Sequence, residues 1–505
     1  MAHTPDPTPA TGRSTREPAG RGVRGTRTGF GSRLSDWVAR AGAALALTAV
    51  GIVLGQQYMQ PDKRVLSLMA AVVLAGVAWR LDLVTSIGMM IFLLPFPKTT
   101  TFGTTNTAIE LLIAILWLVN ASQGRTTALR RTPLDMALLG LVIVYACSFY
   151  NITDPASMAT ALANFEIFLS SVLCFYMIVS NVNTTKALER VHTFQILCAL
   201  CVFLIAAYEL GHPGAVLGWI RLGEPAGVGT GEGISLHGRR VGSSFHDYEL
   251  LSEFAVVTMQ LGLFLWARAT SMIRRSLLSA FLLLNLFVLF ATVTRGAIVS
   301  LALGLLVMLW TARRRVQFVP LVIGLSVFLT LFVGMNYYVA NFTASGNMFG
   351  RLSETHFEGV VPDSRIGTWV PGLQRAMTHP WIGQGPAYVA IFGFGFTYPH
   401  NVYIYYANIV GFVGLGFFLL ILVGLARMTV PTVDSLRHHD YARAFQLVAQ
   451  AQFVTFVVNE TKIDYLRNSS YTPVVWVMIS MWVATYMVAR SNQAAEAHAR
   501  PVPAR

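Results

Sequence analysis

The sequence predicts an all-α, polytopic integral-membrane protein, a bundle of about twelve to fourteen transmembrane helices. Two observations on composition support this class, namely the high hydrophobicity and the low fraction of charged residues. Of the 505 residues, 54% are hydrophobic and only 12% are charged, and the mean hydropathy is +0.56. A soluble protein carries about a quarter charged residues. The third observation is that the apolar residues form runs of about 15 to 25, the length with which a helix crosses a bilayer.

The two ends of the chain differ from its middle. Residues 1–36 are rich in Pro, Gly, Thr and Arg and contain no apolar segment of the kind found in a signal peptide. We expect them to form a disordered basic cytoplasmic tail. A single transmembrane domain is expected over 37–489, followed by a second cytoplasmic tail over 490–505.

The predicted spans follow one another with mostly short connections. They cover residues 37–57, 65–79, 83–97, 108–121, 133–149, 159–180, 191–209, 248–267, 277–293, 296–311, 317–339, 402–427, 443–459 and 472–489. Several are short for a layer of about 30 Å, and 65–97 would also fit one re-entrant pair. A count of twelve to fourteen follows.

The formal net charge of +13 raises the question of a nucleic-acid partner. The basic residues, however, cluster in short connections such as "QGRTTALRR" and "TARRR", as the positive-inside rule requires of cytoplasmic loops. Charge therefore indicates topology, and no nucleic-acid partner is expected. With a cytoplasmic N-terminus, two long connections, about 210–247 and about 340–401, face outward.

Arginines in these outward parts are candidates for binding an anionic ligand. Arg295 lies between two apolar runs, Arg239 and Arg240 precede a span, and Arg365 opens a polar segment. A guanidinium suits phosphate oxygens, and a lipid phosphate or diphosphate is the ligand expected at this depth. Each arginine alone is equally compatible with solvated surface or with snorkelling to lipid headgroups.

The second long connection holds a candidate base and a candidate surface helix. His400 follows Pro399 and directly precedes an apolar span, and a histidine can accept a proton from a hydroxyl near neutral pH. In "SRIGTWVPGLQRAM", helical spacing predicts an amphipathic helix on the outer membrane surface, ended by "THPWIGQGP". Its predicted apolar face consists of Ile366, Trp369, Leu373 and Met377.

Acidic residues open the span near residue 248. His246, Asp247, Glu249 and Glu253 would fit an oxygen-rich cation site. They would equally cap the incoming helix and pair with Arg239 or Arg240. Phosphate-loop and "HExxH" motifs are absent from the sequence, and neither a metal nor a cofactor is expected.

The order of these motifs resembles the O-antigen ligase and polysaccharide polymerase superfamily of membrane glycosyltransferases. The resemblance is strongest over residues 235–427. It rests on "TRGA" (Thr294 to Ala297), Arg365 with Trp369, Pro380 with Gly383 and Gly385, His400 with Asn401, and the stretch "RRVGSSFHDYELLSEFA" with Arg240 and Gly242. In that stretch "FHDYE" stands where the family commonly has a Pro-Asn pair.

The resemblance implies a GT-C-like enzyme without metal or cofactor in the inner membrane of a bacterium. Such an enzyme transfers a glycan from undecaprenyl diphosphate to an acceptor hydroxyl of a glycan, lipid A core or protein on the periplasmic side. Carried over to this chain, Arg240, Arg295 and Arg365 would bind the diphosphate, and His400 would orient or deprotonate the acceptor. Arg239, Asp247, Trp369 and Asn401 would support them.

Two alternatives remain open at this level. A ligase that attaches finished chains and a polymerase that extends lipid-linked repeats share this chemistry, so the motifs do not separate them. A polysaccharide or lipid transporter or flippase would also have twelve or more helices. In a transporter, we expect discontinuous helices near mid-membrane, at corresponding positions of the two halves of the chain. In this sequence the polar groups instead concentrate in two unequal outward connections.

Overall fold

The computed structural model describes a large part of the chain. The described residues are 81–97, 99–100, 103–124, 126, 129–212, 214–217, 220–221, 240–312, 318–343, 347–353, 357–358, 361–387, 399–430 and 440–499. All of them belong to one compact unit over residues 70–505. The predicted spans 37–57 and 65–79 and the predicted N-terminal tail lie outside the described residues.

Helices make up almost all of the described structure. Its α-helices are α3 (Leu83–Leu93), α4 (Thr105–Ser122), α5 (Asp135–Cys147), α6 (Pro155–Asn181), α7 (Thr185–Gly211), α8 (Tyr248–Arg268), α9 (Met272–Ala291), α10 (Arg295–Ala312), α11 (Phe318–Phe342), α12 (Met348–Ser353), α13 (Asp363–Ala376), α15 (Val402–Thr429), α16 (Tyr441–Asn459) and α17 (Thr472–Ala499). Short 3-10 turns are η1 (Ser148–Asn151), η2 (Ser243–Phe245) and η4 (Tyr465–Arg467).

Strands are confined to three two-residue antiparallel ribbons within the described residues. They pair β1 (Thr99–Thr100) with β2 (Gly103–Thr104), β3 (Val216–Leu217) with β4 (Ile220–Arg221), and β5 (Phe357–Glu358) with β6 (Val361–Pro362). The predicted all-α class is therefore confirmed.

Each predicted span from residue 83 onward coincides with a helix. Six of the described helices, α6, α7, α8, α9, α15 and α17, are long and apolar enough to cross a membrane, and α3, α4, α5, α10 and α11 are shorter apolar helices. These helices make the protein polytopic. At its C-terminal end α17 continues to Ala499, so the first ten residues of the predicted C-terminal tail are helical.

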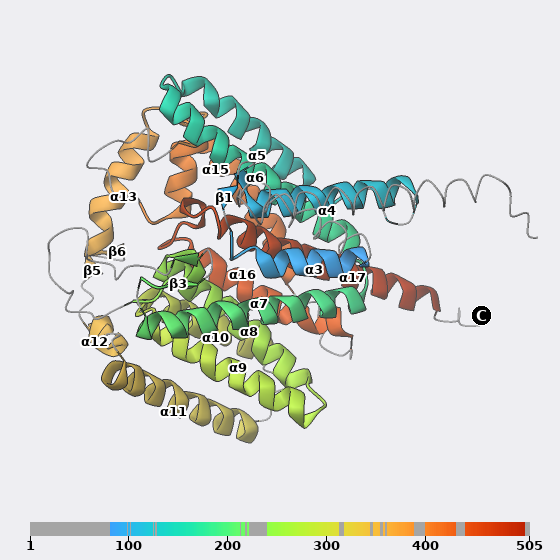
Figure 1. The fold of residues 1–505 in the computed structure, drawn as a ribbon, viewed down its shortest axis with the longest axis vertical. Helices are drawn as coiled ribbons and strands as arrows, with labels where there is room; N and C mark the ends of the chain where they lie inside the picture. The colour runs from blue at the N-terminus through green and yellow to red at the C-terminus, as the bar shows by residue number, and fades with distance from the viewer. Residues whose placement is uncertain are drawn as a thin grey trace, which may run out of the picture. The chain divides into compact units, whose positions relative to one another are not determined.

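Helices α8, α16 and α17 form the centre of the bundle (Figure 1). In the apolar windows of α8 and α17, 83% of the residues are buried, against 39% in α6, α7 and α9. Helix α16 packs against α8, α10 and α17. It carries polar side chains inward, and Gln452 both donates to the carbonyl of Val257 (3.0 Å) and accepts from Trp482 Nε1 (2.9 Å). Such hydrogen bonds join helices where lipid offers no partners.

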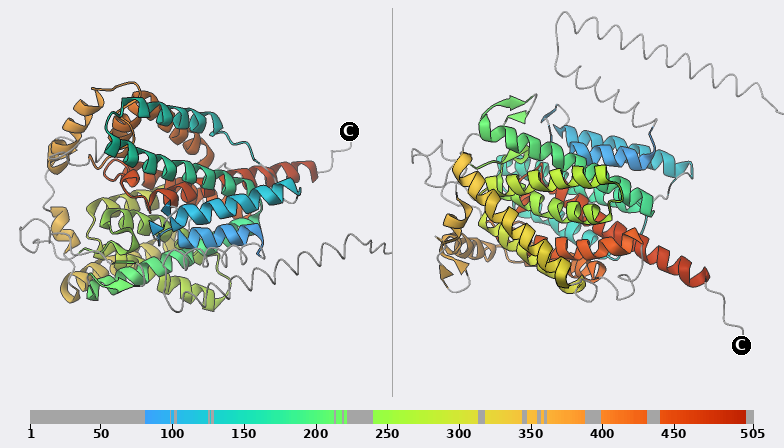
Figure 2. Two further views of the ribbon diagram at one scale, coloured as in Figure 1. Left: turned by 45° about the horizontal axis from the view of Figure 1, so that its top comes forward. Right: turned by 90° about the horizontal axis from the view of Figure 1, so that it is seen from below.

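Asp247 and Asn401 form the caps at which α8 and α15 begin. Asp247 caps α8 by accepting from two backbone N–H groups (2.9 and 3.1 Å), and Asn401 caps α15 in the same way (3.0 and 3.1 Å). Figures 1 and 2 show α12 and α13 at one end and the C-terminal end of α17 at the opposite end. Helix α13 packs on α15.

Helix α13 confirms the predicted amphipathic helix, but its outward face is rotated from the predicted one. Leu373 and Met377 are exposed as expected, and Val370 joins them. Trp369 is instead partly buried, with its Nε1 atom inside the protein. The side chain of Ile366 lies outside the described residues. The rotation follows from Gly372, whose missing side chain lets α13 approach Ile404 of α15 closely.

Helix α15 is broken at Gly411, which has φ 68° and ψ −176°. The carbonyls of Asn408 and Ile409 lose their helical partners there, and the turn after α13 replaces them. Backbone N–H groups of Gln384 and Gly385 donate to these carbonyls at 2.8 and 3.0 Å. In the reverse direction the N–H groups of residues 412 and 413 donate to the carbonyls of residues 380 and 381, at 2.7 and 3.3 Å. A break at membrane depth requires such replacement, because lipid offers no hydrogen bonds.

Candidate functional site

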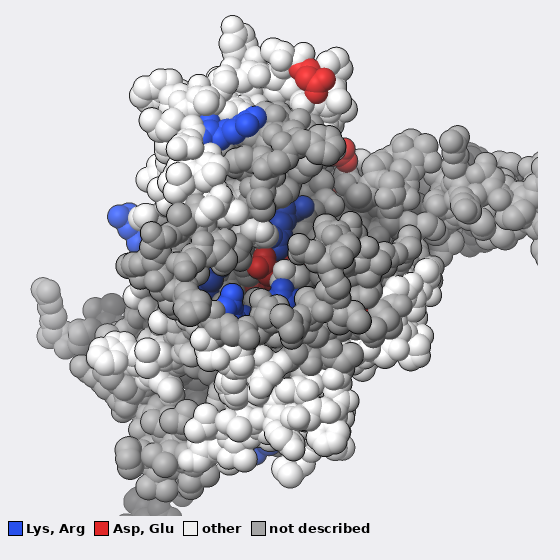
Figure 3. All heavy atoms as spheres, turned by 90° about the vertical axis from the view of Figure 1, so that its left-hand side faces the viewer, with Lys and Arg blue, Asp and Glu red and all other residues white. Residues whose placement is uncertain are grey.

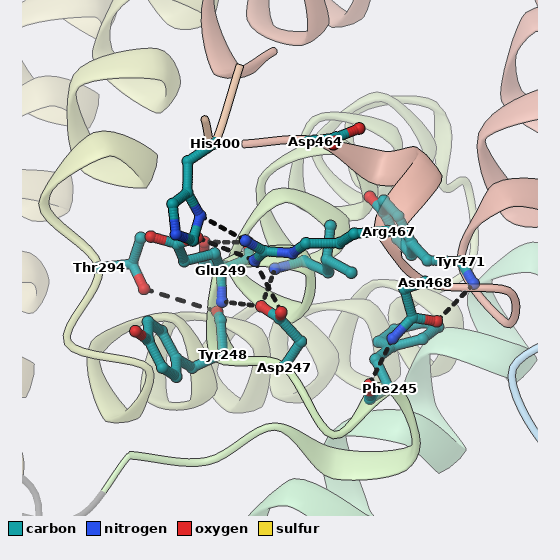
Figure 4. Close-up of polar contacts among 12 residues, drawn as sticks. Phe245, Asp247, Tyr248, Glu249, Thr294, His400, Asp464, Arg467, Asn468 and Tyr471 are labelled. Atoms are coloured by element: carbon teal, nitrogen blue, oxygen red, sulfur yellow. Dashed lines mark hydrogen bonds and ion pairs between the residues drawn. The ribbon is translucent and has the colours of Figure 1, made fainter. Parts of the chain in front are cut away.

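Four charged or ionisable side chains meet where α8 and α15 begin (Figure 4). Arg467, in η4 just before α17, lies at the middle of the group. Its Nη2 atom is 2.6 Å from Asp247 Oδ2 and 2.8 Å from Glu249 Oε2. Its Nη1 atom is 2.5 Å from Nδ1 of His400, and Glu249 Oε2 is 3.3 Å from the same ring nitrogen. Three distant parts of the chain are joined in this way.

The electrostatics of the cluster favour a permanently charged Arg467. The side chain is only 11% exposed. Burial works against its charge, but the carboxylates of Asp247 and Glu249 outweigh burial and raise the pKa of the guanidinium above its usual value. His400, with 25% of its side chain exposed, is the most accessible of the four residues.

Arg240 extends the site towards the start of α10. Its Nη2 atom donates to the carbonyl of Val293 (3.2 Å), and its guanidinium lies over the ring of Tyr248, 4.0 Å from the centroid. Thr294 Oγ1 in turn approaches the carbonyl of Tyr248 at 3.5 Å. Arg295 begins α10 directly after this contact and is partly buried. The two arginines therefore belong to one region of the fold.

The connection between α16 and α17 closes the site from a further side. Lys462 Nζ donates to the carbonyl of Gly296 (3.1 Å), and the carbonyl of Glu460 accepts from Val402 N (2.9 Å). Asn401 Nδ2 donates to the carbonyl of Thr461 (3.2 Å). Residues 460–467 thus join the beginnings of α8, α10 and α15.

Backbone conformation is unusual around the cluster. His246, Val293 and His400 have φ values of 54°, 49° and 47°, in the left-handed region. This conformation is costly for residues other than glycine, most of all for a β-branched residue such as Val293. It persists only where surrounding contacts enforce it, and such residues concentrate at functional sites.

The arrangement suits an anion. Helices α8, α10 and α15 present their N-termini to this region, and each N-terminus carries partial positive charge. Arg240, Arg295 and Lys462 add full positive charges, whereas the two carboxylates of Asp247 and Glu249 outnumber the single guanidinium of Arg467. Figure 3 views this end of the protein and shows basic side chains around an acidic one in a recess.

The structure brings together most of the residues predicted from the sequence. Arg240, Arg295, His400, Asp247 and Asn401 all lie at the beginnings of these three helices. Arg365 lies in the first turn of α13, but its side chain is outside the described residues, as is the whole of Arg239.

Of the two partners predicted for the acidic residues, Arg240 is not used, and Arg239 lies outside the described residues. The carboxylates of Asp247 and Glu249 pair with Arg467 and not with Arg240, which bonds to Val293 instead. Among the described residues no group of three or more His, Cys, Asp or Glu is placed to hold a metal ion. The predicted cap by Asp247 is confirmed.

Sequence reasoning missed Arg467 and the buried carboxyls Glu460 and Asp464, both of which are 0% exposed. The signal was the stretch "NETKIDYLRNSSY", which carries four charged residues in a short connection between two predicted spans. A charge-rich turn of this kind next to helix beginnings predicts a polar site.

Fold and site together define a multi-pass membrane protein with a polar, partly buried site at one end of its helices. The sequence model of the family described as O-antigen ligase matches residues 280–419. The chain therefore contains a domain of the O-antigen ligase superfamily, whose members are glycosyltransferase-type enzymes acting on a lipid-linked glycan and an acceptor. No curated protein sequence matches the chain.

The matched segment runs from α9 to the middle of α15. It includes Arg295, Arg365, Trp369, His400 and Asn401, whereas Arg240 and Asp247 precede it and Arg467 follows it. Residues on both sides of the matched segment thus complete the site.

Proposed function

We propose that the protein transfers a glycan from a polyprenyl diphosphate, such as undecaprenyl diphosphate, to an acceptor hydroxyl at the outer face of a bacterial cytoplasmic membrane. The proposal is carried by one observation: Arg240, the start of α10 and His400 lie together at one end of the bundle. The start of α10 and His400 also lie within the matched domain. Both termini would then be cytoplasmic and the site would face the periplasm.

The reaction assigns a role to each group. The acceptor oxygen attacks the anomeric carbon, the bond from that carbon to the diphosphate oxygen breaks, and lipid diphosphate leaves. Arg240, Arg295 and Arg365 neutralise the charge that develops on the leaving oxygen, without a metal ion. His400 orients or deprotonates the acceptor hydroxyl. Asn401 and Asp247 hold the helix beginnings, Trp369 holds α13 against the bundle, and Arg239 adds positive charge beside Arg240.

The acceptor distinguishes two forms of this function. A ligase would use lipid A core or a protein hydroxyl, and a polymerase would use the terminal sugar of a second lipid-linked glycan. Surface polysaccharide of cells lacking the gene separates them. Loss of long chains indicates a polymerase, and accumulation of finished chains on the carrier indicates a ligase.

Reconstitution of the purified protein in liposomes with lipid-linked glycan and acceptor tests the proposal. We expect glycan transfer by the native protein and loss of transfer in a folded His400→Ala variant. His212→Ala is the matched control, because His212 is an exposed histidine at the end of α7. Movement of the lipid-linked glycan across the bilayer without formation of a glycosidic bond would instead show a transporter or flippase.

A further inference from the structure

The contacts of Arg467 limit where His400 carries its ring proton. A guanidinium has only N–H donors and no acceptor. At 2.5 Å, Nη1 of Arg467 therefore donates to Nδ1 of His400, and this nitrogen must present its lone pair. Neutral imidazole has one proton, so that proton lies on Nε2.

Glu249 is the competing partner of the same ring nitrogen. A proton on Nδ1 would donate to Glu249 Oε2, as in a carboxylate-oriented catalytic histidine. That distance is 3.3 Å, longer than a charge-assisted hydrogen bond, whereas Glu249 Oε2 lies 2.8 Å from Nη2 of Arg467. All three short contacts are explained if Arg467 donates to Asp247, Glu249 and His400 together (Figure 4).

Arg467 is held firmly enough to impose this choice. The carboxylate of Asp247 caps α8 with Oδ1 and binds Arg467 with Oδ2, so that the guanidinium is fixed to the first turn of a central helix. His400 is equally constrained, because its φ of 47° is maintained by the cap and loop contacts around it. Among the described residues, both polar contacts of the His400 side chain use Nδ1. The Nε2 edge is left for a ligand.

We propose that Arg467 is a positioning residue that fixes His400 in the tautomer with its proton on Nε2, so that His400 acts on the substrate as a hydrogen-bond donor. The inference rests on the proposed function and decides between the two roles given there to His400. A ring nitrogen that already carries a proton cannot remove one from the acceptor. Nε2–H instead donates to a substrate oxygen, and the proton of the acceptor hydroxyl passes to the leaving diphosphate oxygen.

Steady-state transfer by reconstituted protein tests the role of His400. A glutamine side chain retains an N–H donor near the position of Nε2 but cannot act as a base. We expect His400→Gln to keep at least about ten times the kcat of His400→Ala, since a donor in place is worth about that much or more. If His400→Gln is as inactive as His400→Ala, the donor role is wrong.

The same assay tests Arg467. Because it contacts His400 and not the substrate, Arg467→Gln should lower kcat by about tenfold or more and leave the KM for the lipid-linked donor unchanged. In the His400→Ala background the substitution should have no further effect. An additive loss in that background, or a rise in KM with kcat unchanged, would show that Arg467 does not act through His400.

Arg443→Gln is the matched control. Arg443 is also a buried arginine with ion pairs, to Asp440 and Glu496, but it lies at the beginning of α16, the opposite end of that helix from η4. It should lower the melting temperature as Arg467→Gln does and leave kcat unchanged.

A spectroscopic measurement separates this inference from the proposed function. Nitrogen-15 NMR of histidine-labelled protein, with the His400 signals assigned by their absence in His400→Gln, reports the tautomer without substrate. We expect an unprotonated Nδ1 in the native protein and a mixture of tautomers in Arg467→Gln. A proton on Nδ1 in the native protein would overturn the inference, whereas a native protein with the expected tautomer but no transfer would overturn only the proposed function.

Discussion

At the scale of single residues, Arg240 offers the most direct test of anion binding. Its guanidinium stacks on Tyr248 beside the start of α10, so its charge faces the region of three helix N-termini. We expect Arg240→Ala to lower kcat/KM for transfer about a hundredfold, since loss of one preorganised charge contact costs about 3 kcal/mol in the barrier. Transfer assays with donor titration measure this.

The control for Arg240 is Arg490→Ala. Arg490 is an exposed arginine near the far end of α17, where no substrate contact is proposed. Its removal should leave transfer unchanged. Equal losses in the two variants would indicate a general effect of net charge on the membrane protein and would contradict the assigned role of Arg240.

Asp464 allows a prediction on pH. Burial raises the pKa of this carboxyl from its ordinary value of 3.8 to about 7, although the nearby charge of Arg467 opposes the shift. Between these two pH values the folded protein binds a proton that the unfolded chain has released, so stability falls as the pH rises through the window. Asp464→Asn should show a smaller fall in melting temperature from pH 4 to pH 7.

Asp154 provides a comparison, because the pKa of its carboxyl is shifted in the opposite direction. It caps α6, and hydrogen bonds from Ser157 lower the pKa of its carboxyl. Asp154→Asn should therefore shift the melting temperature by a similar amount throughout this pH window. If Asp464→Asn keeps the slope of the native protein, the buried carboxyl does not titrate there.

Part of the site was predictable residue by residue. Arg240, Arg295 and His400 are conspicuous because charged or ionisable groups next to apolar runs are costly and need a reason. The pairing of Asp247 and Glu249 with Arg467 was not predictable, because more than 200 residues separate the partners and the pairing depends on how residues 460–467 fold over the beginning of α8. Arg240 is nearer in sequence, and this proximity favoured it as the predicted partner in place of Arg467.

At the scale of elements, hydropathy was sufficient to locate the long apolar helices from residue 83 onward, but not α12 or α13. An apolar run of this length has no alternative in lipid but to form a helix. The break in α15 could not be predicted, because "YYANIVGFVGLGFF" is apolar except for Asn408 and glycine is common in transmembrane helices. The rotated face of α13 was also beyond reach, since it depends on a close approach at Gly372.

Gly411→Ala should destabilise the protein substantially. A Cβ atom at Gly411 would lie 2.4 Å from the carbonyl of Trp381, and its φ of 68° is costly for alanine. We expect a loss of about 2 kcal/mol or more, seen as a lower melting temperature in detergent and as increased proteolysis in the turn at residues 380–385.

Gly416→Ala is the control within the same helix. No atom lies within 4 Å of a Cβ built at Gly416, and its backbone is helical. Alanine there should be neutral or slightly stabilising, because it favours helix more than glycine does. A similar loss in both variants would mean that α15 is sensitive to any change and would remove the special role of the break.

At the scale of the whole molecule, the proposed function requires one orientation. The connection between α8 and α9 should face the cytoplasm and the connection between α16 and α17 should face outward. Thr270 and Ser469 are exposed residues in these two connections. In a cysteine-free background, Ser469→Cys should react with a membrane-impermeant maleimide in spheroplasts, and Thr270→Cys should react only after the membrane is disrupted. The opposite pattern would place the site in the cytoplasm.

The turn that completes α15 has a consequence for how this protein tolerates change in chain length. Surface loops between helices usually accept inserted residues at little cost. Residues 380–385, however, supply backbone hydrogen-bond partners to the interior of α15. Even one inserted residue would change the register of these hydrogen bonds and leave peptide groups of α15 without partners in lipid. We therefore expect insertions in homologous chains to avoid this short turn, despite its position outside the helices.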